Sequence, residues 1–234
     1  MVHDEAGGAA TRCGEDLSAA PEFDGAAFDE AALEAARKLF AGPCEFFHAA
    51  QTLDQLPPQR GPEVAFAGRS NVGKSSLLNA LTGRRALARV SSTPGRTKQL
   101  NFFDLGGRLT LVDMPGYGYA EAAKSVKEAW QGAMFDYLRG RATLRRVMLL
   151  IDARVGFKPA DAEAMTLLDK AACAFQIVLT KADKLKPPAL AAMAEKAGAT
   201  ARAHTAALPS VLATSSETGT GIAELRAEIA ALCA

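Results

Sequence analysis

A glycine-rich segment behind a short apolar run has the residue types and spacing of a phosphate-binding loop. The pattern Gly, four residues, Gly-Lys-Ser is matched by Gly68, Arg69, Ser70, Asn71, Val72, Gly73, Lys74 and Ser75. Glycines let the backbone turn tightly, and amides at a helix N-terminus attract phosphate. Lys74 can then reach the β- and γ-phosphates of a nucleotide, and the Ser75 hydroxyl can bind Mg²⁺. A chance glycine-rich turn is disfavoured, because residues 64–67 predict a buried strand and 76–81 predict a helix.

An acid and a glycine follow the next predicted strand, in the segment Asp113, Met114, Pro115 and Gly116. Asp113 can bind Mg²⁺ through water, and the Gly116 N–H can approach a γ-phosphate. Such short spacings are common in turns and are weak evidence alone. Behind a phosphate loop and at a strand end, the segment predicts a second phosphate-sensing element.

A third segment, Thr180, Lys181, Ala182 and Asp183, fits the Asn/Thr-Lys-x-Asp pattern of guanine recognition. The Asp183 carboxylate can accept hydrogen bonds from guanine N1–H and the N2 amine, whereas adenine would leave it unpaired, which is costly. The segment therefore predicts GTP rather than ATP, against the alternative of a helix-capping Asp. Later in the chain the backbone amides of Thr214, Ser215 and Ser216 are expected to face guanine O6.

A polar, basic segment, residues 91–98, predicts a long loop before the second strand. A threonine hydroxyl there can complete the Mg²⁺ shell only when a γ-phosphate is present, so the loop is a candidate switch. Thr93 and Thr97 both qualify by residue type.

The elements that must position these segments alternate between strands and helices. This alternation predicts a three-layer α/β fold with a mostly parallel central sheet and one antiparallel hairpin strand. Predicted strands are 44–50, 64–67, 99–105, 108–112, 147–151, 175–179 and 211–214, and predicted helices are 28–39, 76–81, 121–138, 159–172, 187–201 and 221–232. Gly106-Gly107 joins the hairpin. Ligands bind at the carboxyl ends of such strands, where each segment falls.

Charge is unevenly distributed along the 234 residues, although the net charge is +1. Residues 1–60 hold 4 basic and 11 acidic residues, and residues 61–234 hold 23 basic and 15 acidic residues. The second part therefore permits a polyanionic partner such as RNA, although a scattered, solvated surface would give the same count. We expect a disordered acidic tail over 1–25, an N-terminal extension over 26–62 that leads into the first strand, and a GTPase domain over 63–234.

Location follows from what the chain lacks. No apolar run approaches the roughly 20 residues of a membrane span, and the start lacks the basic and apolar regions of a signal peptide. Cys13, Cys44, Cys173 and Cys233 are not spaced as metal ligands and suit a reducing compartment. We expect a cytoplasmic protein.

Together these motifs resemble the translation-factor class of P-loop GTPases, and the stretches 68–76, 93–97 and 113–120 resemble the EngB family (also called YihA or YsxC). The resemblance covers roughly residues 40–234. It implies a GTPase that assembles the large ribosomal subunit and is needed for cell division and septation. The implied partners are the rRNA and ribosomal proteins of the large-subunit precursor. No membrane contact is implied, and the protein is expected to be a monomer. Thr180 departs from the usual Asn, and its hydroxyl can replace part of the Asn contacts.

The resemblance also assigns residues. Ser75 and Thr97 are the implied Mg²⁺ ligands, and Lys74, Thr97 and Gly116 are expected to act on the reacting phosphate. GTP or GDP is held by the four segments above together with Gly95, Arg96, Thr97, Lys98 and Gln99, of which Gln99 is only a positional match.

Two residues bear on the rate of hydrolysis. Tyr117 stands where many GTPases carry a water-orienting Gln, so slow hydrolysis is expected without a partner. Asn71 resembles an Asn that binds K⁺ in related GTPases. It either supports a K⁺ ion or only shapes the loop.

Other residues and functions leave alternatives open. Two basic clusters are candidate RNA contacts or solvated loop ends: Arg84, Arg85, Arg89, Arg96 and Lys98, and Arg139, Arg141, Arg145 and Arg146. The rival functions are a cell-division module with GTP as a structural ligand and an ATP-dependent phosphotransferase.

Overall fold

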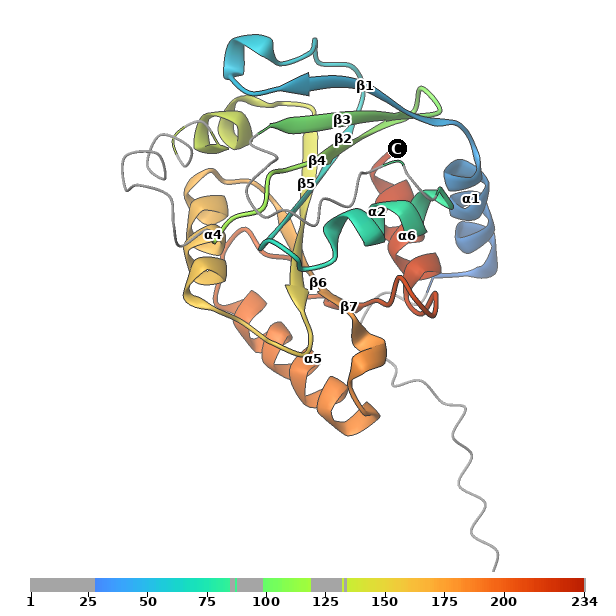
Figure 1. The fold of residues 1–234 in the computed structure, drawn as a ribbon, viewed down its shortest axis with the longest axis vertical. Helices are drawn as coiled ribbons and strands as arrows, with labels where there is room; N and C mark the ends of the chain where they lie inside the picture. Colours follow the sequence, from blue (N-terminus) through green and yellow to red (C-terminus); the bar gives the residue numbers. More distant parts are fainter. Residues whose placement is uncertain (1–27, 85–86, 88–98, 119–131, 133, 234) are drawn as a thin grey trace, which may run out of the picture.

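A single mixed sheet organises the chain in the computed structural model, which describes residues 28–84, 87, 99–118, 132 and 134–233. The strands in chain order are β1 (Cys44–Ala50), β2 (Glu63–Gly68), β3 (Leu100–Leu105), β4 (Leu109–Asp113), β5 (Leu144–Asp152), β6 (Phe175–Thr180) and β7 (Leu212–Ala213). Within the described residues they lie in the order β1-β3-β4-β2-β5-β6-β7 (Figure 1).

Among the described strands, β3 runs in the direction opposite to all the others. It pairs antiparallel with β1 and with β4, whereas the pairs β2–β4, β2–β5, β5–β6 and β6–β7 are parallel. Gly106 and Gly107 turn the β3–β4 hairpin with φ of 61° and 68°, in the left-handed region that favours glycine. The predicted parallel sheet with one antiparallel hairpin strand is confirmed.

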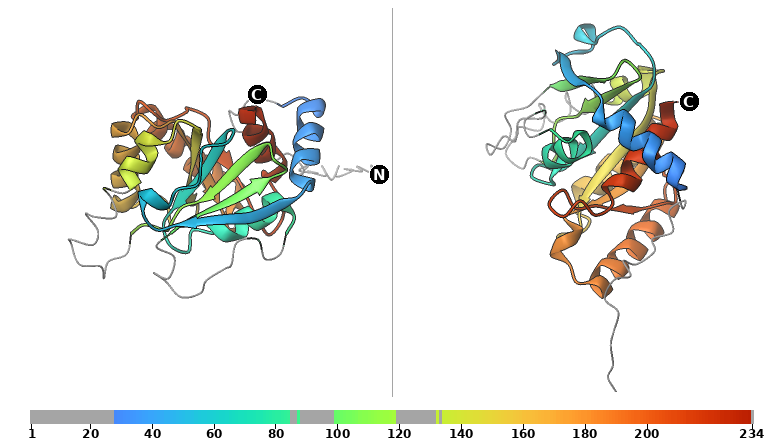
Figure 2. Two further views of the ribbon diagram at one scale, coloured as in Figure 1. Left: turned by 90° about the horizontal axis from the view of Figure 1, so that it is seen from above. Right: turned by 90° about the vertical axis from the view of Figure 1, so that its right-hand side faces the viewer.

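Helices cover both faces of the sheet and make three layers (Figure 2). The helices are α1 (Glu30–Ala41), α2 (Lys74–Thr82), α4 (Pro159–Lys170), α5 (Pro187–Arg202) and α6 (Ile222–Ala230), with further helical residues at 132 and 134–140 and short 3-10 turns at Leu53–Gln55, Ala182–Lys184 and Ala231–Cys233. α1, α2 and α6 share one hydrophobic core, and residues 134–138, α4 and α5 share the other. Most of the predicted helix 121–138 lies outside the described residues.

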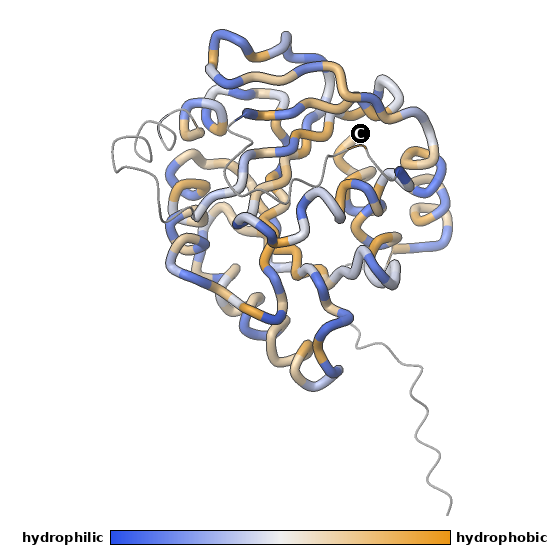
Figure 3. The backbone as a smooth tube through the Cα atoms, viewed as in Figure 1, coloured by the Kyte–Doolittle hydropathy of each residue, from blue (hydrophilic) through white to orange (hydrophobic). Residues whose placement is uncertain are grey.

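Alternate residues of β2 separate these two cores. Val64 and Phe66 pack with α1, α2 and α6, whereas Ala65 and Ala67 face the layer that holds α4 and α5. Burial on both faces explains why the parallel strands are continuously apolar, as the central tube in Figure 3 shows. No helix among the described residues is long and apolar enough to cross a membrane.

The predicted N-terminal extension joins the same sheet through β1, an edge strand. α1 begins at Glu30 rather than at the predicted Phe28, because the Asp29 carboxylate accepts a hydrogen bond from the Ala32 N–H at 2.7 Å and caps the helix.

Candidate functional site

The predicted phosphate loop connects the end of β2 to the start of α2. Gly73 has φ of 104° and precedes the helix, so the amides of the first turn of α2 are not capped by a side chain. Asn71 also has positive φ, 63°, which Asn tolerates better than most residues. A Cβ on Gly68 would lie 2.8 Å from Val72 Cγ1, so the loop packs too tightly there for a larger residue. These amides form an anion-binding N-terminus.

Lys74 and Asp113 meet at this N-terminus. The Lys74 ammonium donates to Asp113 Oδ1, and both side chains are largely buried. Asp113 ends β4, which lies beside β2 in the sheet. The pair thus places a cation and a carboxylate next to the free amides of the phosphate loop.

The oxygen donors here fit a hard divalent cation. Ser75 is half-buried in the first turn of α2, one residue after the lysine that Asp113 holds. Within the described ranges no three His, Cys, Asp or Glu side chains cluster as metal ligands. A hydroxyl and one carboxylate suit Mg²⁺, which usually keeps waters and takes further oxygens from phosphate.

Residues 114–117 run alongside the phosphate loop. Met114 N–H donates to Phe66 O at 3.0 Å, and Tyr117 N–H donates to Gly68 O at 3.3 Å. A Cβ on Gly116 would lie 2.9 Å from Ser70 Oγ and 3.2 Å from Ser70 N, so only glycine fits without displacement. The predicted phosphate-sensing segment and the phosphate loop are therefore in direct contact.

The predicted switch loop is not part of this geometry. Thr93, Gly95, Arg96, Thr97 and Lys98 lie outside the described residues. Gln99 is described, and its side-chain amide donates to Asn101 Oδ1 at 3.1 Å.

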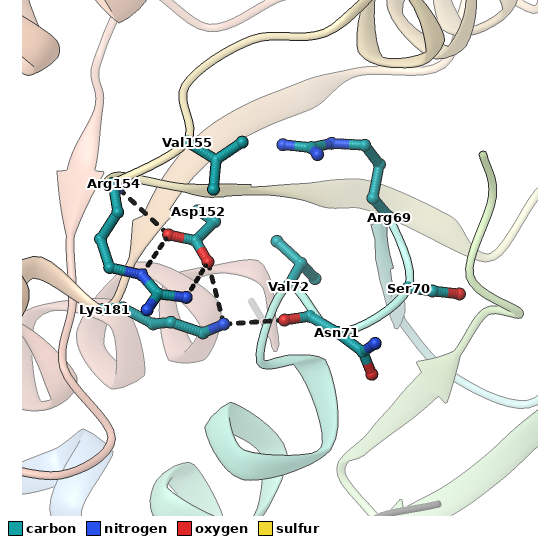
Figure 4. Close-up of a pocket in the computed structure, with 8 residues that line it drawn as sticks. All are labelled: Arg69, Ser70, Asn71, Val72, Asp152, Arg154, Val155 and Lys181. Carbon is teal, nitrogen blue, oxygen red and sulfur yellow. Dashed lines mark hydrogen bonds and ion pairs between the residues drawn. The ribbon is translucent and has the colours of Figure 1, made fainter. Parts of the chain in front are cut away.

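The predicted base-recognition loop is tied to the phosphate loop by two side chains. The Thr180 hydroxyl donates to Val72 O at 2.6 Å, and Lys181 Nζ donates to Asn71 O at 2.8 Å. Lys181 itself has φ of 58°. Its ammonium also contacts Asp152 Oδ2 at 2.9 Å, as the dashed lines in Figure 4 mark. The side chain of Asn71 points away from Lys181 in the same view.

Ser215 contributes to the site in a way that sequence reasoning missed. Its hydroxyl donates to Asp183 Oδ1 at 2.6 Å, and Lys184 Nζ lies 3.0 Å from Asp183 Oδ2. The hydrogen bond from Ser215, and then the Lys184 ammonium, lower the pKa of Asp183 below its usual value. Asp183 is thus held ionised and oriented.

The amides of the 214–216 segment are not equivalent. Thr214 N–H donates to Leu179 O at 2.7 Å, and Ser215 N–H donates to Thr220 O at 2.9 Å. Among the described residues, the Ser216 N–H is the amide of the three without a protein acceptor. If this segment binds guanine O6 through a backbone amide, the Ser216 N–H is therefore the available donor.

Asp152 and Arg154 were not predicted as site residues. They line a cavity of about 250 Å³ beside the phosphate loop, with Arg69, Val155 and Lys181 (Figure 4). Arg154 donates to Asp152 through Nε to Oδ1 at 3.0 Å and through Nη2 to Oδ2 at 2.8 Å. The position of Asp152, directly after the apolar run 147–151 at a strand end, was the available signal.

The second predicted basic cluster does not form one exposed surface, and most of the first cluster lies outside the described residues. Arg141 is 6% exposed and forms a bidentate ion pair with Glu63, which is 1% exposed. Arg146 contacts Glu228 and donates to Gln176 Oε1 at 3.0 Å. Arg139 and Arg145 are exposed, whereas Arg84 donates to Gly42 O and the other members of the first cluster lie outside the described residues. The second cluster is therefore not a single exposed patch, because Arg141 and Arg146 are paired with Glu63 and Glu228, and RNA contact by the exposed Arg139 and Arg145 stays a prediction.

Comparison with known proteins agrees with this geometry. A family model described as "50S ribosome-binding GTPase" matches residues 63–181. "Probable GTP-binding protein EngB" of Granulibacter bethesdensis is 68% identical over 204 residues, which cover 87% of this chain and 92% of that protein. The protein of the same name in Gluconobacter oxydans is 68% identical over 201 residues, covering 86% and 88%.

Solved structures show the same fold. "Crystal structure of a probable GTP-binding protein engB" matches with a TM-score of 0.57 and 24% identity, covering 73% of this chain and 98% of that one. Era in complex with MgGDPNP and a segment of 16S ribosomal RNA matches with a TM-score of 0.55 and 21% identity, covering 71% and 55%.

Proposed function

This chain belongs to the EngB family of GTP-binding proteins and is a GTPase, and from this premise we propose that it is a nucleotide switch in the assembly of the large ribosomal subunit. The observation that carries the proposal is the match of residues 63–181 to a family described as binding the 50S ribosome. The excess of basic over acidic residues in 61–234, 23 against 15, supports a polyanionic partner. The protein acts as a monomer in the cytoplasm, and normal septation depends on it through ribosome supply.

In this proposal the phosphate loop and Asp113 act in sequence on the nucleotide. Lys74 leaves Asp113 for the β- and γ-phosphate oxygens, where its charge and the loop amides stabilise the transition state. The freed Asp113 carboxylate would then support Mg²⁺ through a water molecule. Ser75 and Thr97 would hold Mg²⁺, which would supply positive charge to stabilise the reacting phosphates.

Guanine is recognised at the opposite end of the site. The Asp183 carboxylate, oriented by the Ser215 hydroxyl at 2.6 Å, accepts the two N–H groups of the base. The Ser216 N–H donates to O6. The Lys181 stem lies along the base while its ammonium stays on Asn71 O.

Intrinsic hydrolysis is slow in this proposal because, among the described residues, no side chain beside Gly116 is of a type that orients the attacking water. Tyr117 replaces the usual Gln, and its hydroxyl donates to Asp161 at 2.9 Å. Burial, and then the charge of Asp161, raise the pKa of Tyr117 far above its usual value, so the phenol stays neutral and is no base. A ribosomal particle is expected to supply the missing acceleration.

The test is GTP hydrolysis with and without purified large-subunit particles, in K⁺ and in Na⁺. We expect several-fold stimulation by large-subunit particles and none by small-subunit particles, and loss of hydrolysis in Lys74→Ala. Tight GTP binding without stimulation would overturn the ribosomal proposal and leave the cell-division module. A K⁺ requirement that Asn71→Ala abolishes would assign the ion to Asn71, and equal rates in both salts would leave Asn71 a loop-shaping residue.

A further inference from the structure

Asp161 is a buried carboxylate that belongs to none of the nucleotide motifs. It lies in the first turn of α4, and its side chain has no exposed surface. Its Oδ2 accepts the Lys158 N–H at 2.8 Å, which caps the helix. A neutral residue could satisfy this one donor, so capping alone does not explain a buried charge.

Two further donors reach Asp161 from the nucleotide site. Arg69 Nε, in the phosphate loop, lies 3.1 Å from Oδ1 and 3.0 Å from Oδ2. The Tyr117 hydroxyl, one residue after Gly116, donates to Oδ1 at 2.9 Å. Arg69 also donates to Gly156 O at 2.9 Å, which fixes the guanidinium from its other edge. One carboxylate thus joins the phosphate loop, the second phosphate-sensing segment and α4.

The side-chain contacts matter because the backbone contacts between the two segments are long. Ser70 N–H to Tyr117 O and Tyr117 N–H to Gly68 O are both 3.3 Å, beyond the usual range for strong N–H···O bonds. Hydrogen bonds to a charged acceptor are roughly twice as strong as neutral ones. The Asp161 contacts are therefore the stronger restraint on Tyr117, and through it on Gly116.

Close packing makes this restraint effective. Gly116 already lies against Ser70, and a Cβ on Gly118 would lie 3.6 Å from Arg69 Cγ and 3.6 Å from Ala160 Cβ. Gly118, with φ of 86°, lets the chain pass between the phosphate loop and α4. Gly116 therefore has little room to shift toward Ser70 while Tyr117 stays bonded to Asp161.

We propose that Asp161 is a positioning residue for γ-phosphate recognition, which holds Tyr117 and Arg69 so that the Gly116 N–H is already in place for the γ-phosphate. This inference rests on the proposed role of Gly116. Preorganised donors cost no reorganisation when the ligand arrives. GDP has no γ-phosphate and gains nothing from Gly116, so the effect of Asp161 is specific to GTP.

Tyr117→Phe is the decisive variant, because it removes one hydroxyl and keeps both the α4 cap and the Arg69 ion pair. Tyr137→Phe is the matched control, since the Tyr137 hydroxyl is buried and makes no hydrogen bond to any described residue. Affinities for GDP and for a non-hydrolysable GTP analogue are measured with Mg²⁺ by calorimetry. We expect Tyr117→Phe to weaken the GTP analogue by about tenfold, as for loss of a bond to a charged group, and GDP by less than about twofold.

Asp161→Asn provides a second measurement, since the amide oxygen keeps the cap but loses the charge. The same selective loss of the GTP analogue is expected, with a lower kcat. Equal weakening of both nucleotides, or no change in Tyr117→Phe, would overturn the inference and leave Asp161 a purely structural residue. Failure of the wild-type protein to bind either nucleotide would instead overturn the role of the phosphate loop, so the two failures are distinguishable.

Discussion

Three acidic side chains of the candidate site are each held by donors from the protein. Asp183 is oriented by Ser215, Asp152 by Arg154 and Lys181, and Asp113 by Lys74. Each acid stands at or just after the carboxyl end of a parallel strand. A change at one of them is therefore expected to alter a specific property of the site.

Asp183→Asn is expected to exchange the base preference. The amide can accept only with its oxygen and would place a donor near the guanine N–H groups, so GTP binding weakens by at least about a hundredfold. Xanthine nucleotides, which present a carbonyl in place of the N2 amine, bind better than to the wild type. Competition binding with GTP and XTP checks this. Glu217→Gln, which alters another acid on Lys184, is the control; unchanged GTP affinity in Asp183→Asn would contradict the assignment.

Asp152 is expected to contribute stability that depends on pH. Burial alone would raise its pKa, but hydrogen bonds from Arg154 and Lys181 outweigh burial and hold the pKa at about 2. A depressed folded-state pKa means that the contribution is complete above pH 3.8, the usual value, and is lost as pH falls through about 2. The shift corresponds to about 2 kcal/mol.

Urea unfolding of the wild type and Asp152→Asn between pH 7 and pH 2 measures that contribution. The wild-type advantage should be constant above about pH 5 and should shrink toward pH 2. Glu224→Gln, on the exposed side of α6, controls for the general effect of removing an acid. An advantage that does not vary with pH would refute the ion-pair explanation.

At the level of elements, the C-terminal end of α2 is capped by a side chain of α6. The N-terminal amides of α2 stay open for phosphate, while Gly83, with φ of 64°, ends the helix. Arg226 of α6 donates to Leu81 O at 2.8 Å and to Ala80 O at 3.0 Å. A cation at a helix C-terminus also opposes the negative end of the helix dipole. α6 therefore stabilises the helix that carries Lys74 and Ser75.

Arg226→Ala is expected to lower the free energy of unfolding by about 2 kcal/mol, because two carbonyls lose a charged donor. The guanidinium also lies 5.9 Å from the Phe40 ring centroid, so packing against α1 is lost as well. Urea denaturation measures the change. Arg202→Ala, at the exposed end of α5, is the control and should stay within about 0.5 kcal/mol of the wild type. Equal effects of the two substitutions would contradict the capping role.

Across the whole molecule, the sequence predicted the fold better than the side-chain contacts. Continuous apolar runs at 147–151 and 175–179, and the glycine loop before a helix, required only local patterns. The Arg69–Asp161 contact joins residues 92 apart, and Arg141 meets Glu63 78 residues earlier. Local sequence patterns do not reveal which charged residues pair across such distances. Arg141 was therefore assigned to an exposed basic cluster, and Asp161 was missed.

Basic charge in residues 61–234 predicts a salt-dependent encounter with ribosomal particles. Neutralised phosphates release counterions, so particle-stimulated hydrolysis should fall by at least about tenfold when NaCl rises at constant KCl from about 50 to about 200 mM. Intrinsic hydrolysis, measured in parallel without particles, should change little. Stimulation that is insensitive to salt would indicate a partner recognised without its phosphate backbone.

The links from Thr180 to Val72 O and from Lys181 to Asn71 O make the two ends of the site one rigid span. A nucleotide bound as proposed must therefore place its base at Asp183 and its phosphates at the phosphate loop across a fixed distance. The two loops thus select a nucleotide by the distance between its base and its phosphates, as well as by the identity of the base. Guanine nucleotides with a longer or shorter link between ribose and phosphate would reach either the base site or the phosphate loop, but not both.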